Sequence, residues 1–276
     1  MAAGWASVPA SSVLALLVAC FELGATATAF DHGFAAYGDL LQSVVHGPRV
    51  DYAALDADRR PLDRIVATFA EPAQSEEQSW SREQRMAFWI NAYNVLTLRA
   101  IVSHYPIRAG VFTLSPRNSI RQIDGVWTAL AWDVAGRRVT LDDIEHRILR
   151  PTFADARVHF AINCASISCP LLADVPYRAE TLDAALDAAA RRYLSSAEGL
   201  RVDGDTVSVS SIFKWYGDDF ISQYSPLAPN GRNARERAIL GTIVRFGPAQ
   251  TAERVRTGRS RIKYLHYDWS LNDLAR

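Results

Sequence analysis

The chain has 276 residues and carries 30 basic side chains (Lys and Arg) against 30 acidic ones (Asp and Glu), so its formal net charge is zero. The two signs are interspersed, which removes the electrostatic reason to expect nucleic acid or an anionic membrane as a partner. We find no internal repeat, low-complexity tract or linker, and we therefore expect residues 30–276 to form a single globular domain.

The start of the chain has the pattern of an export signal. Residues 11–21 (SSVLALLVACF) form an apolar run that is short for a membrane span but suits the core of a signal peptide. Ala27 and Ala29 form an A-x-A cleavage site, so residues 1–29 are predicted to be a signal peptide. The sequence LVAC also fits a lipoprotein cleavage box, which would leave a lipid on Cys20. We expect an exported protein, periplasmic or secreted, with a lipid anchor on a bacterial membrane as the alternative, and no transmembrane span in the mature chain.

Apolar periodicity then predicts a mixed order of helices and strands. Residues at three- and four-residue spacing predict helices at 33–45, 53–70, 81–104, 141–150, 179–196 and 233–246. Alternating residues predict hairpins at 132–139 and 200–209, a buried strand at 157–163 and a last strand at 261–267. The absence of a regular strand–helix alternation in this order favours an α+β fold.

The helix predicted at 81–104 is the first element that bears on function. Its residues 87–98 (AFWINAYNVLTL) are apolar almost all round, which is typical of a central, buried helix. Asn91 and Asn94 are the exceptions, and their three-residue spacing puts them on one face. A buried amide is costly unless it is hydrogen-bonded, so these two either tie neighbouring backbone into the core or border a polar cleft.

The helix predicted at 141–150 begins with a capping-box pattern of Thr140 and Asp143. Asp142 and His146 are four residues apart and can pair on one face, whereas Glu145 is expected to point about 100° away from His146. The Asp–His pair is either a surface ion pair near a helix end or the orienting pair of a catalytic imidazole.

The segment 157–170 (RVHFAINCASISCP) carries the strongest chemical candidate. If the strand continues to Cys164, that thiol lies on the apolar face and His159 on the opposite face. His159 is then a poor base for Cys164, and His146 or His266 is the expected partner.

Three interpretations compete for Cys164 and Cys169. In an oxidising compartment they could form a disulfide, or Cys164 could be a nucleophile activated by a nearby histidine. A redox or metal pair is the third, but the C-x4-C spacing matches neither a C-x-x-C motif nor a zinc knuckle. No metal and no cofactor is predicted.

The C-terminal segment offers a second candidate pair. His266 and Asp268 share a face of the predicted last strand, as a base and its orienter would, or they simply form its wet face. Lys214, Trp215 and Tyr216 are interpreted as packing residues, with Lys214 reaching solvent.

Five separated motifs together resemble a known family. They are FWINAYN at 88–94, IEHRILR at 144–150, HFAINCASISCP at 159–170, SIFKWY at 211–216 followed by Asp219 and Phe220, and YDWSLND at 267–273. In this order, from about residue 35 to the C-terminus, they resemble the domain of unknown function 547. The resemblance implies an exported bacterial protein with a distant likeness to papain- or transglutaminase-like cysteine enzymes. Such a likeness would pack the central helix against a mostly antiparallel sheet.

The resemblance also implies which residues converge, without assigning their roles. They are Asn91, Tyr93, Asn94, Glu145, His146, Cys164, Cys169, Trp215 and Asp268. One departure limits the likeness, because papain-like sites place the nucleophilic cysteine at the start of the central helix. Here that helix carries Asn91 and no cysteine.

Two hypotheses follow. The first is a cysteine-dependent hydrolase or acyltransferase in which Cys164 attacks a carbonyl carbon, His146 takes its proton and Asn91 or Asn94 steadies the oxyanion. Glu145 is a further catalytic candidate, and the binding candidates are Tyr93, Trp215, His266 and Asp268, for an unidentified small-molecule or peptide ligand. The second hypothesis is a non-catalytic binding or structural module with a Cys164–Cys169 disulfide.

Overall fold

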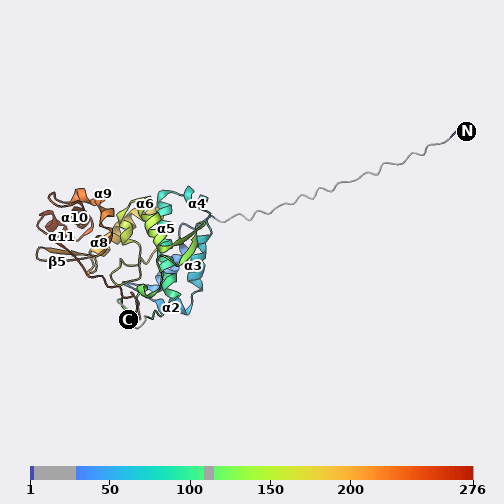
Figure 1. Cartoon of the computed structure of the whole chain (residues 1–276), viewed down its shortest axis with the longest axis horizontal. Coiled ribbons are helices and arrows are strands. Elements are labelled where there is room, and N and C mark those ends of the chain that lie inside the picture. Colours follow the sequence, from blue (N-terminus) through green and yellow to red (C-terminus); the bar gives the residue numbers. More distant parts are fainter. Residues whose placement is uncertain (3–28, 109–114, 276) are drawn as a thin grey trace.

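The computed structural model describes residues 1–2, 29–108 and 115–275 (Figure 1). The predicted core of the signal peptide and Cys20 lie outside the described residues, so export and lipidation stay predictions. No helix of the described ranges combines the length and the apolar character that a membrane crossing requires.

The described part of the chain folds into many helices and three small sheets. The α-helices are α1 Ala35–Val44, α2 Tyr52–Ala57, α3 Arg60–Ala70, α4 Gln74–Ser79, α5 Arg82–Val102, α6 Arg150–Phe153, α7 Leu182–Leu194, α8 Ile212–Tyr216, α9 Ile221–Tyr224, α10 Ala234–Phe246 and α11 Ala249–Arg256. The other helical segments are η1 Ile120–Gln122, η2 Asp143–Leu149, η3 Ala156–Phe160, η4 Ala179–Thr181, η5 Gly217–Phe220 and η6 Ser225–Leu227. The strands are β1 Val45–His46, β2 Arg49–Val50, β3 Ala131–Val134, β4 Arg137–Thr140, β5 Leu200–Asp203, β6 Thr206–Val209 and β7 Arg261–Tyr264.

The strand pairs are antiparallel with one exception. β1 pairs with β2, β3 with β4 and β5 with β6 as antiparallel neighbours, while β7 adds to β6 in parallel. The α+β class predicted from the sequence is therefore confirmed. The two predicted hairpins are also confirmed, and each turns on a glycine with positive φ, Gly136 at +66° and Gly204 at +50°.

The central helix α5 begins at a complete capping box. Ser81 accepts from the backbone N–H of Gln84, and the Gln84 side chain accepts from the backbone N–H of Ser81. All residues of 86–98 are buried, and α5 is contacted by α2, α3, η2 and η4. The prediction of a buried central helix is confirmed.

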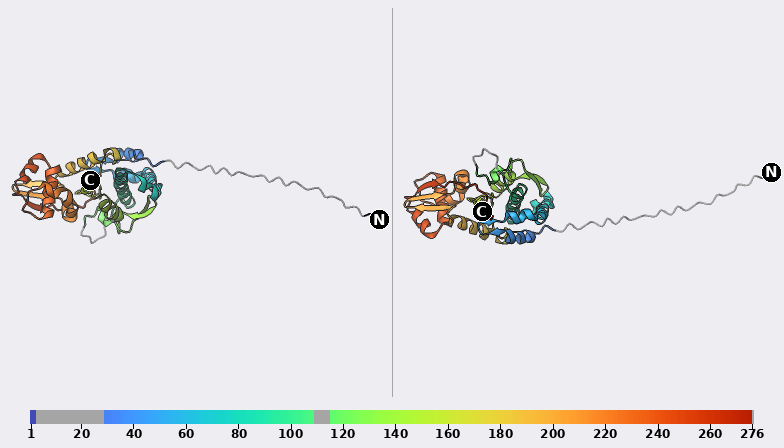
Figure 2. Two further views of the ribbon diagram at one scale, coloured as in Figure 1. Left: turned by 90° about the horizontal axis from the view of Figure 1, so that it is seen from above. Right: turned by 90° about the horizontal axis from the view of Figure 1, so that it is seen from below.

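The buried residues fall into two clusters, at the two ends of the molecule (Figures 1 and 2). The first core surrounds α5, and the second lies among α7, the β5–β7 sheet and α8–α10. The chain after β7 returns from the second core to the first, where Leu271 is buried and Asn272 accepts a hydrogen bond from the Tyr52 hydroxyl at 2.8 Å. This return brings C-terminal residues beside the middle of the chain.

The predicted strand at 157–163 is wrong, because the chain forms the 3-10 helix η3 there. Asp155 caps this helix by accepting from the backbone N–H of Arg157 at 3.0 Å, and Val158 N–H bonds the carbonyl of Asp155. A short apolar run suits either a strand or a helix, so alternation alone could not decide between them.

The helix predicted at 141–150 forms, but as the π-helix η2 followed by α6. Its predicted cap is confirmed, because Asp143 Oδ2 accepts from Thr140 N–H at 3.0 Å and Thr140 Oγ1 accepts from Asp143 N–H at 3.1 Å. A π-turn is wider than an α-turn and recurs at functional sites. The predicted helix at 53–70 is divided into α2 and α3, and the other four predicted helices form with shifted ends.

Candidate active site

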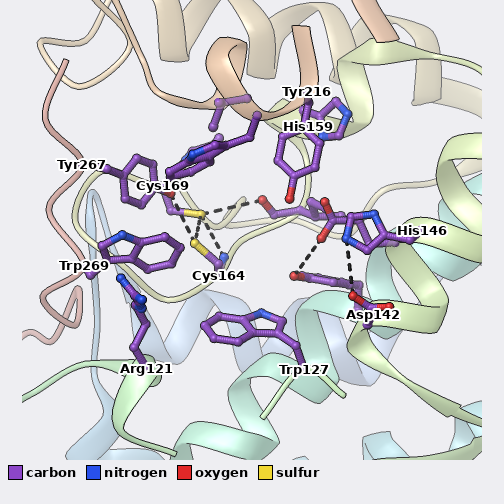
Figure 3. A pocket seen from close by; sticks show the side chains of 16 residues that line it. Arg121, Trp127, Asp142, His146, His159, Cys164, Cys169, Tyr216, Tyr267 and Trp269 are labelled. Atoms are coloured by element: carbon purple, nitrogen blue, oxygen red, sulfur yellow. Dashed lines mark hydrogen bonds and ion pairs between the residues drawn. The ribbon is translucent and has the colours of Figure 1, made fainter. Parts of the chain in front are cut away.

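A pocket of about 550 Å³ draws its walls from α5, η2, η3, α8, the loop after η3 and the C-terminal segment (Figure 3). Its lining residues are Tyr93, Arg121, Trp127, Asp142, Glu145, His146, His159, Ile162, Cys164, Cys169, Pro170, Ile212, Trp215, Tyr216, Tyr267 and Trp269. The lining residues come from both hydrophobic cores, so the pocket lies where the two cores meet. Of the predicted site residues, it brings together Tyr93, Glu145, His146, Cys164, Cys169 and Trp215.

The loop that carries Cys164 is held by the side chain of Asn163. Asn163 Oδ1 accepts from the backbone N–H of Ala165 at 2.8 Å, and its Nδ2 donates to the carbonyl of Pro170 at 2.7 Å. Ala165 has a φ of +59°, a left-handed conformation that costs a non-glycine residue roughly 1–2 kcal/mol. Such strain persists only where the surroundings enforce it. The bonds of Asn163 therefore hold a strained loop that presents Cys164 to the pocket.

Hydrogen-bond donors converge on the sulfur of Cys164. It lies 2.7 Å from Cys169 Sγ, 3.1 Å from Ser166 Oγ and 3.3 Å from the hydroxyl of Tyr267. Burial opposes ionisation, but the hydrogen bonds from these three side chains outweigh it and lower the pKa of the Cys164 thiol. Burial and the hydrogen bond to Cys164 raise the pKa of Cys169 well above its usual value. Both cysteines are free, and the opposite directions of the two pKa shifts favour ionisation at Cys164 over ionisation at Cys169.

The helix η2 contributes two consecutive side chains, Glu145 and His146, to the same pocket. Glu145 is only 7% exposed and accepts a hydrogen bond from the Tyr93 hydroxyl at 3.4 Å. Burial, the charge of Glu145 and a hydrogen bond to it together raise the pKa of Tyr216. Glu145 and His146 therefore both line the pocket, and the hydrogen-bond partner of Glu145 is Tyr93 and not His146.

The imidazole of His146 is held between a cation and an anion. Its Nδ1 lies 2.8 Å from Arg150 Nη1, and its Nε2 lies 3.5 Å from Asp142 Oδ1. A guanidinium only donates, so Nδ1 is the acceptor and the ring proton is on Nε2. The predicted pairing of Asp142 with His146 is present, and the ring is neutral in this arrangement.

Asp219 links this imidazole to a second one. Its carboxylate accepts from Arg150 Nε at 2.6 Å and from Arg150 Nη2 at 3.0 Å, and it lies 2.8 Å from His159 Nε2. Burial opposes its ionisation, but the hydrogen bonds from His159 and Arg150 hold the pKa of Asp219 well below its usual range. His159 stacks on Tyr216 at 4.2 Å and lines the same pocket as Cys164. This corrects the expectation that His159 faces away, which rested on the strand that does not form.

One side of the pocket is an aromatic wall of Trp127, Trp215, Tyr267 and Trp269. Trp269 is at the centre, with ring centroids 4.7 Å from Tyr267, 5.7 Å from Trp215 and 6.1 Å from Trp127. The guanidinium of Arg121 lies 5.2 Å from the Trp269 ring, within range of a cation–π contact. Trp215 packs against Trp269 as predicted, but its side chain is 43% exposed, so part of its ring also faces solvent. Flat apolar surface thus lies beside the sulfur of Cys164.

Asn91 and Asn94 do not line the pocket. Asn91 donates to the carbonyl of Tyr177 at 2.7 Å and accepts from its N–H at 3.0 Å. Asn94 donates to the carbonyl of Ala161 at 3.0 Å and accepts from the N–H of Asn163 at 2.8 Å. Both amides are therefore occupied in tying backbone into the core, which is the first of the two interpretations of these residues and removes them as oxyanion donors.

The predicted pairing of His266 with Asp268 does not form. His266 is exposed, and Asp268 Oδ1 accepts from the backbone N–H of Ser270 at 2.8 Å. The backbone of Asp268 instead anchors the cysteine loop, because its N–H donates to Ser168 Oγ and its carbonyl accepts from Ser168 N–H. Neither residue lines the pocket.

Several residues of the site were not assigned a role from the sequence. Arg121, Trp127, Tyr267 and Trp269 line the pocket, and Arg150 and Asp219 bond its histidines. The pairings of Asp219 join residues 60 and 69 positions apart, and the return of the C-terminal segment places Tyr267 beside Cys164 across 103 positions. Contacts between residues so far apart in the sequence cannot be predicted from the spacing of neighbouring residues. Within the described ranges, no cluster of three or more His, Cys, Asp or Glu side chains could hold a metal ion.

Comparison with known protein families shows which part of the pocket lies in a recognised domain. Residues 77–194 match a family model described as protein of unknown function, DUF547. The chain contains a DUF547 domain. The matched part of the DUF547 domain carries both cysteines and the whole of η2, whereas α8 and the C-terminal segment of the pocket follow it. Searches of curated proteins and of solved structures gave no significant match.

Proposed function

We propose that the protein is a cysteine-dependent hydrolase or acyltransferase in which Cys164 is the nucleophile and His146 carries the proton. The observation that supports this most is the environment of the Cys164 sulfur, which reaches the pocket and lies within hydrogen-bond distance of the hydroxyls of Ser166 and Tyr267. A thiolate, not a thiol, is the attacking species in acyl transfer, and these donors favour the thiolate.

The reaction needs no base to prepare the sulfur. The Cys164 thiolate attacks an acyl carbon, the carbonyl oxygen becomes an oxyanion, and the bond to the leaving group breaks to give a thioester. The leaving group departs as its anion or takes a proton from solvent. Water or another acceptor then attacks the thioester, His146 accepts the proton of that attacking group, and the C–S bond breaks to release the Cys164 thiolate. We assign the oxyanion to the hydroxyl of Tyr267, since the side chains of Asn91 and Asn94 are bonded elsewhere.

The contact between His146 and Arg150 limits when His146 can accept a proton. Arg150 donates to Nδ1, and the same guanidinium is held by Asp219. His146 therefore takes up a proton on Nδ1 only when the Arg150 contact to that nitrogen is released. A substrate that reaches Glu145 or Asp142 beside it is in a position to cause that release, since both carboxylates line the pocket.

The test is a search for the thioester itself. The reduced protein is mixed with p-nitrophenyl esters and acyl thioesters of varied chain length, quenched in acid and digested for mass spectrometry. We expect an acyl group on Cys164, a loss of product release in Cys164→Ala, and accumulation of the acyl-enzyme in His146→Asn. His46→Asn changes an exposed histidine away from the pocket and serves as the matched control.

A second candidate is a non-catalytic binding module, and the aromatic wall favours it. Exposed tryptophan faces bind ring-bearing ligands without any chemistry. If no ester or thioester acylates Cys164, while a ligand quenches tryptophan fluorescence equally in the wild type and Cys164→Ala, the binding module replaces the enzyme.

A further inference from the structure

Acyl transfer at Cys164 needs one thiol, yet a second one touches it. Cys169 is 5% exposed, and its sulfur lies 2.7 Å from that of Cys164. The backbone N–H of Cys164 also donates to Cys169 Sγ at 2.9 Å. The two sulfurs are therefore held in contact, and the proposed hydrolase uses Cys169 only as a hydrogen-bond partner of Cys164.

The two thiols differ in access and in protonation. Both cysteines line the pocket, but Cys164 is partly exposed, so a small solute can reach it, whereas Cys169 is buried. Hydrogen bonds lower the pKa of Cys164, and burial raises that of Cys169. A reachable thiolate next to a buried thiol is the arrangement in which an oxidised sulfur is captured by its neighbour.

We propose that Cys164 and Cys169 form a site that reduces small hydroperoxides, with Cys164 as the attacking sulfur and Cys169 as the resolving one. This activity goes beyond acyl transfer and does not require it. Its substrate class is hydrogen peroxide and short-chain alkyl hydroperoxides, because the sulfur lies at the wall of a pocket that also admits apolar groups along the aromatic wall.

The chemistry balances with these two thiols and one peroxide. The Cys164 thiolate attacks one peroxide oxygen, so that an S–O bond forms, the O–O bond breaks and Cys164 becomes a sulfenic acid. The departing oxygen takes the proton of the Cys169 thiol and leaves as water or an alcohol. The Cys169 thiolate then attacks the Cys164 sulfur, the S–S bond forms, and hydroxide departs. The sulfurs lose two electrons and the hydroperoxide gains them.

Groups around the sulfurs suit each of these steps. The hydroxyls of Ser166 and Tyr267, at 3.1 and 3.3 Å from Cys164 Sγ, can donate to the peroxide oxygens as the O–O bond breaks. A disulfide requires a sulfur separation of about 2.05 Å, so the two sulfurs need only a small approach. Repeated turnover needs an external dithiol to reduce the disulfide, by thiol–disulfide exchange.

The proposal predicts a fast reaction of the folded protein with one equivalent of hydrogen peroxide. The full chain is reduced, freed of reductant and mixed with peroxide near neutral pH, and samples are quenched with iodoacetamide. Trypsin releases both cysteines in one peptide, residues 158–178, so the disulfide appears as the loss of two hydrogens without interference from Cys20. We expect oxidation at least about tenfold faster than in the same chain unfolded in urea.

Two single variants assign the roles. Cys169→Ser removes the resolving thiol, and we expect a sulfenic acid on Cys164 that dimedone traps. Cys164→Ser removes the attacking thiol, and we expect Cys169 to remain reduced. If Cys169→Ser fails to fold, as judged by circular dichroism, the proposal is still tested by the ratio of oxidation rates between the folded and the unfolded wild type.

The proposal is overturned if the folded protein reacts no faster than the unfolded chain, or if the disulfide forms equally fast without peroxide. It is also overturned if folded Cys169→Ser yields no sulfenic acid under conditions that oxidise the wild type. None of these assays contains an acyl substrate, so their outcome is independent of the proposed hydrolase. A loss of acyl transfer on oxidation, restored by dithiothreitol, is a further consequence that rests on the proposed function.

Discussion

Two buried glutamates contact α5 one helical turn apart, and their surroundings differ. Glu77 has no exposed surface, and its carboxylate is bonded by Arg85 at 2.9 Å, Arg137 at 2.5 Å and the indole N–H of Trp89 at 2.9 Å. Glu145 is almost as deeply buried but forms no ion pair among the described residues. The first carboxylate is saturated by cations, and the second is not.

The partners of Glu145 are hydroxyl groups at the wall of a pocket. Tyr93 donates to it, and Tyr216 is close enough for its pKa to be raised in part by that carboxylate. A buried charge fully neutralised by arginine contributes to the integrity of the fold. A buried charge that faces a cavity with neutral partners keeps its capacity to hold a ligand or a proton. The difference separates a structural cluster from the proposed functional one, and both clusters contact α5.

The largest effect on the functional side is expected from Cys164→Ala. Because the variant lacks the nucleophile, kcat/KM for an acyl ester should fall by at least about 10³-fold. The free energy of unfolding should change by only about 1 kcal/mol, since the side chain is small and partly exposed. Ester turnover and urea unfolding measure the two quantities, and a Cys164→Ala protein with undiminished turnover would refute the assignment.

On the structural side, Glu77→Gln should cost about 3–5 kcal/mol of unfolding free energy, because it leaves Arg85 and Arg137 without their shared carboxylate. The matched change Glu145→Gln keeps the hydrogen bond to Tyr93 and should cost about 1 kcal/mol, while it lowers acyl transfer. Urea unfolding of both variants checks this. Equal destabilisation by the two substitutions would break the comparison.

A smaller effect is expected from Asn94→Ala, which leaves the carbonyl of Ala161 and the N–H of Asn163 without partners. This should cost about 1–3 kcal/mol and displace the loop that holds Cys164, so alkylation of that cysteine should slow. Asn91→Ala is the matched control, because it loses a similar pair of bonds that lie away from the cysteine loop. Equal effects of the two variants on Cys164 alkylation would argue against a role for Asn94 in holding the loop.

The smallest effect concerns Asp219 and depends on pH. Its pKa is lowered in the folded state, so its hydrogen bonds stabilise the protein above the usual carboxyl pKa of about 3.9 and this stabilisation is lost as pH falls below it. The loss is on the order of 1 kcal/mol after solvent screening. The Asp219→Asn variant has no carboxyl group at this position, so its free energy of unfolding should fall less steeply with decreasing pH than that of the wild type. Urea unfolding across the acid range tests it, and an identical pH slope in both proteins would contradict it.

Elements with strong helical periodicity could be predicted from the sequence, and elements decided by tertiary contacts could not. The central helix and both hairpins follow from apolar spacing and glycine turns. The segment around His159 could not be assigned, because its apolar run also suits the 3-10 helix that Asp155 caps. The short helices α4, α8, α9 and α11 were not predicted, since few of their residues carry a periodic signal.

The site divides in the same way. Cys164, Cys169, His146 and Glu145 belong to one stretch of sequence and could be selected from it. Asn91 and Asn94 were candidates because buried amides are costly, yet the backbone groups that occupy them are set by packing alone. The contributions of Tyr267 and Trp269 depend on the return of the C-terminal segment to the first core, which the spacing of residues alone does not indicate.

The most direct test of an activated Cys164 is its alkylation rate by iodoacetamide as a function of pH, followed on the peptide of residues 158–178. We predict a half-maximal rate at a pH below that of a free cysteine, and a shift toward the free-cysteine value in Tyr267→Phe, which removes one hydroxyl donor from the sulfur. A titration that coincides with that of a free thiol in both proteins would contradict the activated thiolate and the reaction proposed for it.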